Sequence, residues 1–312
     1  MYIEQGHRGD IGIWKYFLIP LGFIGLMILN YAVMKLLNLD IEAIMQAEIG
    51  RKGANRFLIE MLMPFVMGLA LLFGWVKLIH RQTLTSLTTS RKRIDWGRIL
   101  FSFILWSVLT IAITGIGIYL SPEEYVLNFR WEPFLYLFII ALFLIPIQTS
   151  FEEYLFRGYM MQGIGIMAKN RWVPLVVTSV LFGLMHLGNP EVEEMGPGIM
   201  VFYIGTGFFL GILTLMDDGL ELALGFHAAN NMISALLVTS EGTAFQVDAI
   251  YKSVVEPKLG FDVFVPVFIV FPILLFIYSK KYKWTDWKER LTGKVMSRET
   301  YLTKDIDGTH IQ

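Results

Sequence analysis

Cysteine is absent from this chain of 312 residues, and charged residues are scarce. The absence of cysteine excludes disulfide bonds, thiolate metal ligands and cysteine nucleophiles. Charged residues make up 17 % of the sequence, whereas a typical soluble domain has about 25 %. The net charge is −1 and no large basic block is present, so we expect no nucleic-acid partner. Any chemistry must come from His, carboxylate, hydroxyl or amide side chains.

Apolar residues are abundant instead, because they make up 55 % of the chain. A helix needs about 20 mostly apolar residues to cross the hydrocarbon core of a bilayer. Eight segments are candidates for such helices: 16–34, 57–76, 99–120, 134–149 with its continuation, 173–186, 199–216, 220–238 and 261–278. The sequence therefore predicts an all-α membrane protein with eight transmembrane helices in the lipid bilayer.

The Lys and Arg residues are distributed unevenly among the predicted loops. Of the 26, 18 lie in stretches on the same side as both termini, and seven lie in the opposite loops. Cytoplasmic loops of membrane proteins are enriched in Lys and Arg. We therefore expect both termini in the cytoplasm, and we expect a multi-pass protein of a bacterial cell membrane.

The predicted helices divide the chain into four parts. Residues 1–130 hold helices one to three, 131–240 hold helices four to seven, 241–282 hold the last helix, and 283–312 form a polar cytoplasmic tail. Asp217 and Asp218 are interpreted as a solvated turn between helices six and seven. We expect 131–240 to be the catalytic core, because the polar residues that interrupt the apolar segments fall within it.

Polar side chains interrupt the apolar segments at three places. A charge at the centre of a bilayer costs roughly 3 kcal/mol or more, so an ionisable residue there is a hypothesis of function. The three groups are Glu152, Glu153 and Arg157 in helix four; Phe182 and His186 in helix five; and His227, Asn230 and Asn231 in helix seven.

Helical spacing separates the two carboxylates of the first group. Glu153 and Arg157 are four residues apart on one helix face, with the acid first, which favours an ion pair. Glu152 lies about 140° around the helix from Arg157. The spacing therefore predicts that Glu153 is neutralised by Arg157 and that Glu152 remains available for chemistry.

The other two groups can be placed relative to Glu152. Glu152 lies 18 residues before Asn170, in a predicted turn, and His186 lies 16 residues after it. These separations correspond to about 27 and 24 Å along antiparallel helices, so the two side chains are expected at similar heights. His227 and Asn231 share one face of helix seven, and Asn230 is expected to face elsewhere. The polar site is therefore predicted between helices four, five and seven.

A carboxylate, two imidazoles and a carboxamide in an apolar setting suit hydrolysis of an amide bond. Glu152 is a candidate general base for water. His227 and Asn231 are candidate donors to the developing oxyanion, and His186 is a candidate to hold the water. The alternative is a zinc ion held by Glu152, His186 and His227, which would activate the water itself. The metal-free mechanism is preferred slightly, because Asn231 is a poor zinc ligand.

The three motifs in this order resemble the CAAX-protease and bacteriocin-processing family of intramembrane proteases, which includes the type II CAAX prenyl endopeptidases. The motifs are Glu152-Glu153-x-x-x-Arg157, Phe182-x-x-x-His186 and His227-x-x-x-Asn231, within about residues 135–237.

The resemblance implies that Glu152 is the catalytic acid or base and that His186, His227 and Asn231 are essential. It also implies that Glu153 and Arg157 support the site. Members of the family are described as either metal-dependent or glutamate-dependent. The eukaryotic members cut prenylated proteins at the cytoplasmic side, and many bacterial members are linked to bacteriocin maturation or immunity. We therefore expect a membrane-associated protein or peptide as substrate and a site toward the cytoplasmic side.

Two other functions use the same residues. A non-catalytic membrane protein, such as a bacteriocin-immunity protein or a chaperone, would use the pocket for binding alone. A transporter is less favoured, because the sequence shows no internal repeat. Taken singly, each motif also has a structural interpretation. Hydrogen bonding between membrane helices, for example, typically contributes about 1 kcal/mol.

Overall fold

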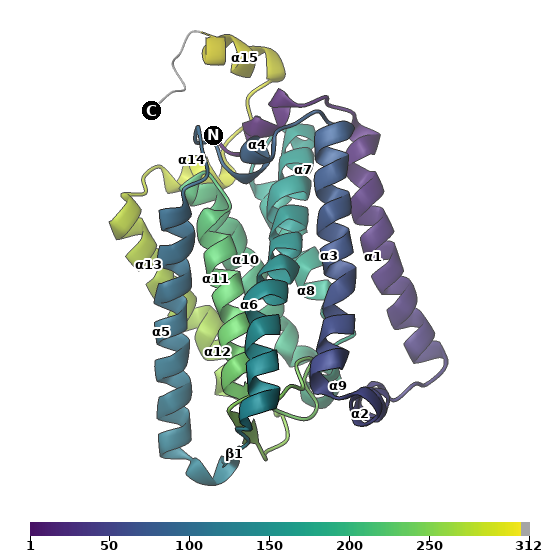
Figure 1. The fold of residues 1–312 in the computed structure, drawn as a ribbon. Helices are drawn as coiled ribbons and strands as arrows, with labels where there is room; N and C mark the ends of the chain where they lie inside the picture. The colour runs from purple at the N-terminus through teal and green to yellow at the C-terminus, as the bar shows by residue number, and fades with distance from the viewer. Residues whose placement is uncertain (307–312) are drawn as a thin grey trace.

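The protein is a bundle of helices that run between two ends of the molecule, as a computed structural model shows for residues 1–306 (Figure 1). The N-terminus lies at one end with η1 (Ile3–Arg8) and α4 (Leu84–Thr88), and α14 (Trp287–Thr292) and α15 (Arg298–Ile306) lie at the same end. Helices α2 (Ile41–Lys52) and α9 (Pro190–Met195) lie at the opposite end. We call these two ends the terminal end and the α9 end.

Six helical stretches of residues 1–306 are long and apolar enough to cross a membrane. They comprise α1 (Ile13–Leu36), α3 (Ala54–Leu78), α5 (Trp96–Leu120), Trp131–Ala168, Pro197–Asp217 with α10 (Met200–Asp217), and Phe261–Tyr282 with α12 (Phe261–Val265), η5 (Pro266–Val270) and α13 (Phe271–Tyr282). Helix α8 (Trp172–Leu184) is apolar but shorter, and α11 (Glu221–Leu237) has 17 residues. All eight predicted segments coincide with these helices, so the all-α membrane architecture is confirmed. That α8 and α11 also cross the bilayer stays a prediction.

The stretch Trp131–Ala168 changes its hydrogen-bonding pattern beside the predicted carboxylates. Helix α6 (Trp131–Glu153) continues as a π-helical segment, η3 (Tyr154–Met160), and then as α7 (Met161–Ala168). π-Helical turns are rare and are frequent at functional sites. The irregular segment begins directly after Glu153, which points to this level of the bundle.

Helices α10 and α11 occupy the interior, where most of their side chains are buried. Two glycines permit close packing there. A Cβ added to Gly207 of α10 would lie 2.5 Å from the carbonyl oxygen of Ser179 in α8. A Cβ added to Gly225 of α11 would lie 2.1 Å from that of Ile99 in α5. Such small residues let membrane helices approach closely.

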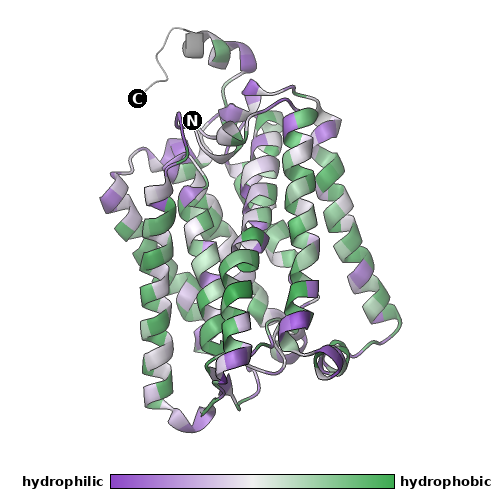
Figure 2. Ribbon diagram, viewed as in Figure 1, coloured by the Kyte–Doolittle hydropathy of each residue, from purple (hydrophilic) through white to green (hydrophobic). Residues whose placement is uncertain are grey.

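The outer helices present apolar side chains to their surroundings. Leu21 and Leu26 of α1, Met67 of α3 and Ile111 of α5 are exposed. Figure 2 shows that hydrophobic residues cover these helices along much of their length. Lipid is the solvent that such a surface fits, because a soluble protein rarely exposes apolar patches this extensive.

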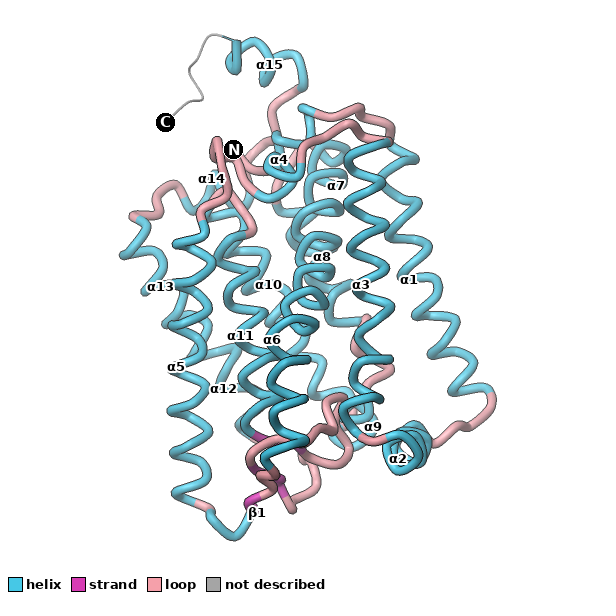
Figure 3. Tube along the Cα trace, in the orientation of Figure 1, coloured by secondary structure: helices cyan, strands magenta, loops and turns pink. Residues whose placement is uncertain are grey.

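A small sheet closes part of the α9 end (Figure 3). Its strands are β1 (Tyr125–Leu127), β2 (Val238–Thr239) and β3 (Tyr251–Ser253), in the order β1-β3-β2. Strand β1 follows the short turn η2 (Pro122–Glu124) and pairs antiparallel with β3, and β2 pairs parallel with β3. The sheet ties the end of α11 to the loops before α6 and α12.

The terminal end contains a cluster of charged side chains that we call the ion cluster. Its members are Arg91, Arg98, Asp217, Asp218, Glu221 and Arg290. Asp217 is buried and pairs with Arg91 at 3.0 Å and with Arg98, and Trp284 Nε1 donates to it at 3.1 Å. The interpretation of residues 217 and 218 as a solvated turn is therefore wrong, because the turn lies beneath the C-terminal segment.

The C-terminal segment folds back onto the bundle as far as the structure describes it. Trp284, Val295 and Tyr301 are buried, and His7 Nε2 lies 2.9 Å from the carbonyl oxygen of Met296. The predicted polar tail at 283–312 is thus part of the folded protein up to α15. Its residues 307–312 lie outside the described part of the chain.

Candidate active site

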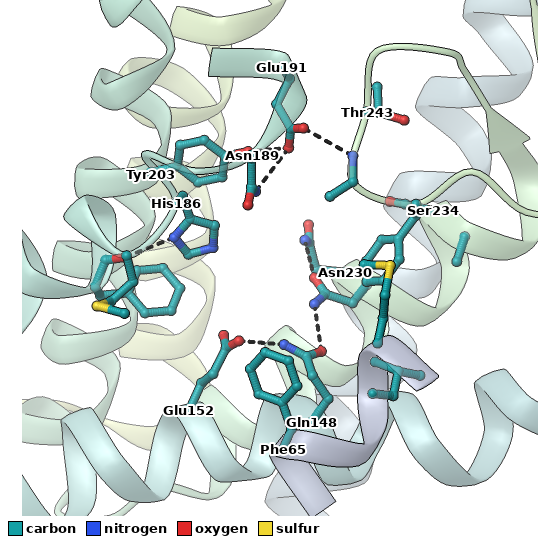
Figure 4. Close-up of a pocket in the computed structure, with 18 of the residues that line it drawn as sticks. Phe65, Gln148, Glu152, His186, Asn189, Glu191, Tyr203, Asn230, Ser234 and Thr243 are labelled. Carbon is teal, nitrogen blue, oxygen red and sulfur yellow. Dashed lines mark hydrogen bonds between the residues drawn. The ribbon is translucent and has the colours of Figure 1, made fainter. Parts of the chain in front are cut away.

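A cavity of about 400 Å³ lies among the helices at the level of Glu152 (Figure 4). Three of the four predicted catalytic residues line it: Glu152 from α6, His186 from the turn after α8, and Asn231 from α11. His227 lies behind Glu152 rather than on the cavity wall. The other lining side chains include Phe23, Met27, Met61, Phe65, Phe156, Phe182, Met185, Phe202 and Phe245.

Glu153 and Arg157 form the ion pair that their spacing predicts. Arg157 Nη1 lies 2.9 Å from Glu153 Oε1, and both side chains are fully buried. Arg157 also donates from Nη2 to the carbonyl oxygen of Gly207 at 3.1 Å. Its guanidinium lies 4.1 Å from the ring centre of Phe182, within range of a cation–π contact. The pair is thus a fixed structural unit beneath the cavity.

Phe182 sits at the centre of the three motifs and is buried. Its ring centre lies 4.9 Å from that of His186 and 5.8 Å from that of His227. It also meets Phe156 edge-on at 5.8 Å. Phe182 therefore spaces the two imidazoles and packs against the Arg157 pair, which is a packing role.

His227 bridges the two adjacent carboxylates. Its Nδ1 lies 2.8 Å from Glu153 Oε1, and its Nε2 lies 3.6 Å from Glu152 Oε2. A carboxylate accepts hydrogen bonds, so Nδ1 carries a hydrogen and Nε2 is the nitrogen left facing Glu152. Glu153 thus fixes the orientation of His227, as outer carboxylates do for functional histidines.

Glu152 has one oxygen fixed and the other free. Gln148 Nε2 donates a short hydrogen bond to Glu152 Oε1. Glu152 Oε2 is buried and has no hydrogen-bond partner among residues 1–306. A buried acceptor without a partner is costly, and in a native protein it calls for an explanation. This oxygen belongs to the predicted catalytic carboxylate, whose residue lines the cavity, and it faces His227 Nε2 at 3.6 Å.

His186 lies in the turn that follows α8 rather than in the helix itself, because α8 ends at Leu184. His186 Nδ1 is 2.8 Å from the carbonyl oxygen of Phe182, which can only accept. The ring stacks on Tyr203 with 4.2 Å between centres. In the neutral ring, Nε2 is therefore an acceptor (Figure 4). Glu152 and His186 both line the cavity, in agreement with their predicted heights.

A chain of amides continues from Glu152 to the far wall. Asn231 Nδ2 donates to Gln148 Oε1 at 3.1 Å, and Asn230 Nδ2 donates to Asn231 Oδ1 at 3.0 Å. Trp106 Nε1 in turn donates to Asn230 Oδ1 at 3.1 Å. The expectation that Asn230 faces away from the site is wrong, because it lines the cavity and contacts Asn231.

Gln148 is a site residue that the motifs miss. It contacts both Glu152 and Asn231, and it lies in the cavity wall. The sequence does contain a signal for it, because Gln148 is a polar residue one helical turn before Glu152 in an otherwise apolar segment. Tyr203 has no comparable signal, since its contact with His186 depends on how α10 packs.

The zinc alternative requires Glu152, His186 and His227 to converge on one point about 2 Å from each ligand atom. Within residues 1–306, no three His, Asp or Glu side chains gather closely enough to hold a metal. Glu152 and His227 are neighbours, and Nδ1 of each ring is held by another acceptor, which leaves Nε2 as the nitrogen that could face a ligand. As these side chains lie, the three do not form a closed His₂Glu ligand set among the described residues.

Comparison with known proteins agrees with the motifs. Residues 130–233 match the family model described as Type II CAAX prenyl endopeptidase Rce1-like. The predicted resemblance is confirmed. The matched segment contains all three motifs and all the site residues above except those of α1 and α3, Trp106 of α5 and residues 234–245. The Rce1-like match supports a CAAX-type intramembrane protease embedded in a membrane.

A relative of similar length is "Uncharacterized protein YyaK" from Bacillus subtilis (strain 168). It is 29 % identical over 245 residues, which cover 76 % of this chain and 82 % of that protein. A bacterial membrane protein is consistent with this relative. No solved structure matches the chain.

Proposed function

We propose that the protein is an intramembrane endopeptidase that hydrolyses peptide bonds of membrane-associated proteins or peptides. The observation that supports this most is Glu152, a carboxylate that lines a cavity of about 400 Å³ and has one buried oxygen without a hydrogen-bond partner among the described residues. The Rce1-like match over the same helices agrees with it.

Glu152 is the general base in this proposal. It removes a proton from a water molecule in the cavity as the water oxygen bonds to the carbonyl carbon of the substrate. The carbonyl π bond breaks and its electron pair becomes the oxyanion. Glu152, now protonated, delivers the proton to the amide nitrogen as the C–N bond breaks, which releases an amine and a carboxylic acid. General acid–base transfer of this kind typically contributes 10² to 10⁴ in rate.

Asn231 acts on the oxyanion in this proposal, and His186 acts on the attacking water. The Asn231 carboxamide nitrogen has two hydrogens and spends one on Gln148, so the second is available to the oxyanion. His186 Nε2 accepts a hydrogen bond and can hold the attacking water. The fixed amide chain behind Asn231 means that the donor needs little reorganisation during the reaction.

His227 is a positioning residue in this proposal. Glu153 holds one side of its ring, and the other side faces Glu152 at 3.6 Å. The imidazole therefore limits where the Glu152 carboxylate can lie. A ring protonated at Nε2 would also donate to Glu152. No step requires a metal ion.

Purified protein tests the proposal directly. Wild type in detergent micelles, incubated with peptides extracted from the membranes of the source cells, is expected to generate new C-termini detectable by mass spectrometry. Glu152→Gln keeps the size of the side chain and an oxygen that can accept from Gln148, but the amide cannot take a proton from water. The new termini should therefore be absent. Equal cleavage by both proteins would overturn the proposal. One zinc per chain, lost in His186→Ala/His227→Ala, would contradict the metal-free mechanism.

A binding function that uses the same cavity makes the opposite prediction. If the cellular phenotype of a deletion is restored by Glu152→Ala as well as by wild type, the protein works by binding. Restoration by wild type alone supports hydrolysis.

A further inference from the structure

The accessible part of the cavity lies toward the α9 end. Asn189, Thr243 and Ala244 line it and are half-buried, and Ser234 of α11 is exposed. Figure 4 shows Glu191 and Thr243 on the side of the cavity opposite Glu152. Among the described lining residues only Ser234 is exposed, and it lies near the end of α11 that joins the sheet at the α9 end, so we place the entrance there.

The rim at this end is built from separate elements. Glu191 of α9 accepts from the backbone N–H of Ala244 at 3.0 Å and also bonds to Tyr203. Met27 of α1 and Met61 of α3 continue the wall and are half-buried. The entrance thus combines a polar edge with apolar side chains, which suits a peptide segment that contains apolar residues.

The terminal end offers no comparable entrance. Residues 151–163 of the Trp131–Ala168 stretch are buried throughout. Gln162 donates to the carbonyl oxygen of Ser86, and the Tyr2 hydroxyl donates to that of Leu87, so η1 and α4 cover this level. In the described chain, no residue of η1, α4, α14 or α15 lines the cavity.

The charge distribution assigns the two ends to the two sides of the membrane. The 18 basic residues counted on the termini's side belong to the terminal end, and the seven from the opposite loops belong to the α9 end. Lys and Arg are enriched in short loops on the cytoplasmic side. The terminal end is therefore the cytoplasmic one, and the α9 end faces outward.

We propose that the substrate reaches Glu152 from the outer face of the membrane, through the α9 end. The inference rests on the proposed endopeptidase function, and it narrows the substrate to an exported peptide or to an outward-facing segment of a membrane protein. The expectations of cytoplasmic termini and of a site toward the cytoplasmic side cannot both hold for this architecture. The geometry of the cavity favours the first.

The absence of cysteine makes the test simple, because every introduced thiol is the only one in the chain. Three single variants are needed: Thr243→Cys at the entrance, Ser234→Cys inside the cavity, and the exposed Lys288→Cys on α14 as the terminal-end control. Intact cells are treated with a membrane-impermeant maleimide before lysis. We expect labelling of Thr243→Cys and Ser234→Cys, and labelling of Lys288→Cys only after permeabilisation.

Two results would overturn the proposal. One is labelling of Lys288→Cys but not Thr243→Cys in intact cells, which would place the terminal end outside. The other concerns Ser234→Cys. If intact cells label Thr243→Cys but not Ser234→Cys, and Ser234→Cys is labelled only after permeabilisation, the cavity opens to the cytoplasmic side. Detergent-solubilised protein has no sidedness, so its cleavage of peptides still decides the endopeptidase function independently.

Discussion

The ion cluster of the terminal end and the cavity both bury charged side chains, and they differ in how completely those charges are paired. In the ion cluster of the terminal end, each carboxylate meets an arginine: Asp217 pairs with Arg91 and Arg98, Glu221 with Arg91, and Asp218 with Arg290. At the cavity, Glu153 is paired in the same way with Arg157, but one oxygen of Glu152 and one of Glu153 have no hydrogen-bond partner in the described chain, and of the two residues Glu152 lines the cavity.

The difference separates structural charge from functional charge. Paired buried charges hold elements together and leave nothing for a substrate. An unpaired acceptor in a cavity wall has the opposite character, because its desolvation cost is recovered only when water or substrate arrives. A related contrast holds within one helix, where Glu153 pairs with Arg157 and its neighbour Glu152 lines the cavity.

The largest effect on stability is expected in the ion cluster. Asp217→Ala leaves Arg91 and Arg98 without their shared buried partner, which costs about 3 kcal/mol. A clear decrease in the melting temperature of the detergent-solubilised protein is therefore expected, with little change in cleavage rate per folded molecule. Thr285→Ala, in the exposed turn nearby, is the control. An unchanged melting temperature would show that pairing in this cluster does not stabilise the fold.

Asn231→Ala tests the cavity side of the comparison. Loss of one preorganised oxyanion donor typically lowers kcat by about 10²-fold. We expect that loss in kcat, with KM and melting temperature close to wild type. A change in KM alone would mean that Asn231 binds substrate without acting on the oxyanion.

Gln148→Ala should have a smaller effect on the reaction. Its hydrogen bonds orient Glu152 and Asn231, and loss of about 1.4 kcal/mol of such orientation corresponds to a tenfold lower rate. The adjacent Thr149→Ala is the matched control, because Thr149 bonds only within its own helix, to Ile145 at 3.1 Å and to Pro146. Equal rates for both variants would remove Gln148 from the site.

The smallest effect is a pH dependence confined to the terminal end. Burial lowers the pKa of His80 from its ordinary value of 6.5, and its ring bonds to Tyr159 and to the backbone of Asp10. Between the two pKa values the unfolded chain binds a proton that the folded chain does not, so stability falls as the pH drops below 6.5. The melting temperature should therefore decrease from about pH 7.5 to about pH 5.5, and His80→Gln should flatten the change. An identical decrease in His80→Gln would assign it to other groups.

Much of this architecture could be predicted from the sequence, because a long apolar run that crosses a bilayer is nearly always a helix. The pairing of Glu153 with Arg157 followed from helical spacing alone. The shared level of Glu152 and His186 followed from counting residues on either side of the 169–171 turn. Each of these depends only on local helix geometry.

The features that the sequence did not predict depend on packing between distant segments. Asn230 lines the cavity because Trp106 of α5 and Asn231 hold its amide there. Asp217 is buried because Arg91 before α5, Arg98 in its first turn and Trp284 from the C-terminal segment close over it. The position of the cavity entrance required the fold of α9 and residues 240–245. None of these contacts has a signature in local periodicity.

The most direct test of the contrast between the cavity carboxylate and the paired carboxylates of the ion cluster is a side-by-side measurement of Glu152→Gln and Asp217→Asn. Both substitutions replace a buried carboxylate by an amide of nearly the same shape. Cleavage rate and melting temperature are measured for each in the same detergent. The account predicts that Glu152→Gln loses cleavage and keeps its melting temperature, whereas Asp217→Asn keeps cleavage and melts lower. Cleavage at the wild-type rate by folded Glu152→Gln would contradict it.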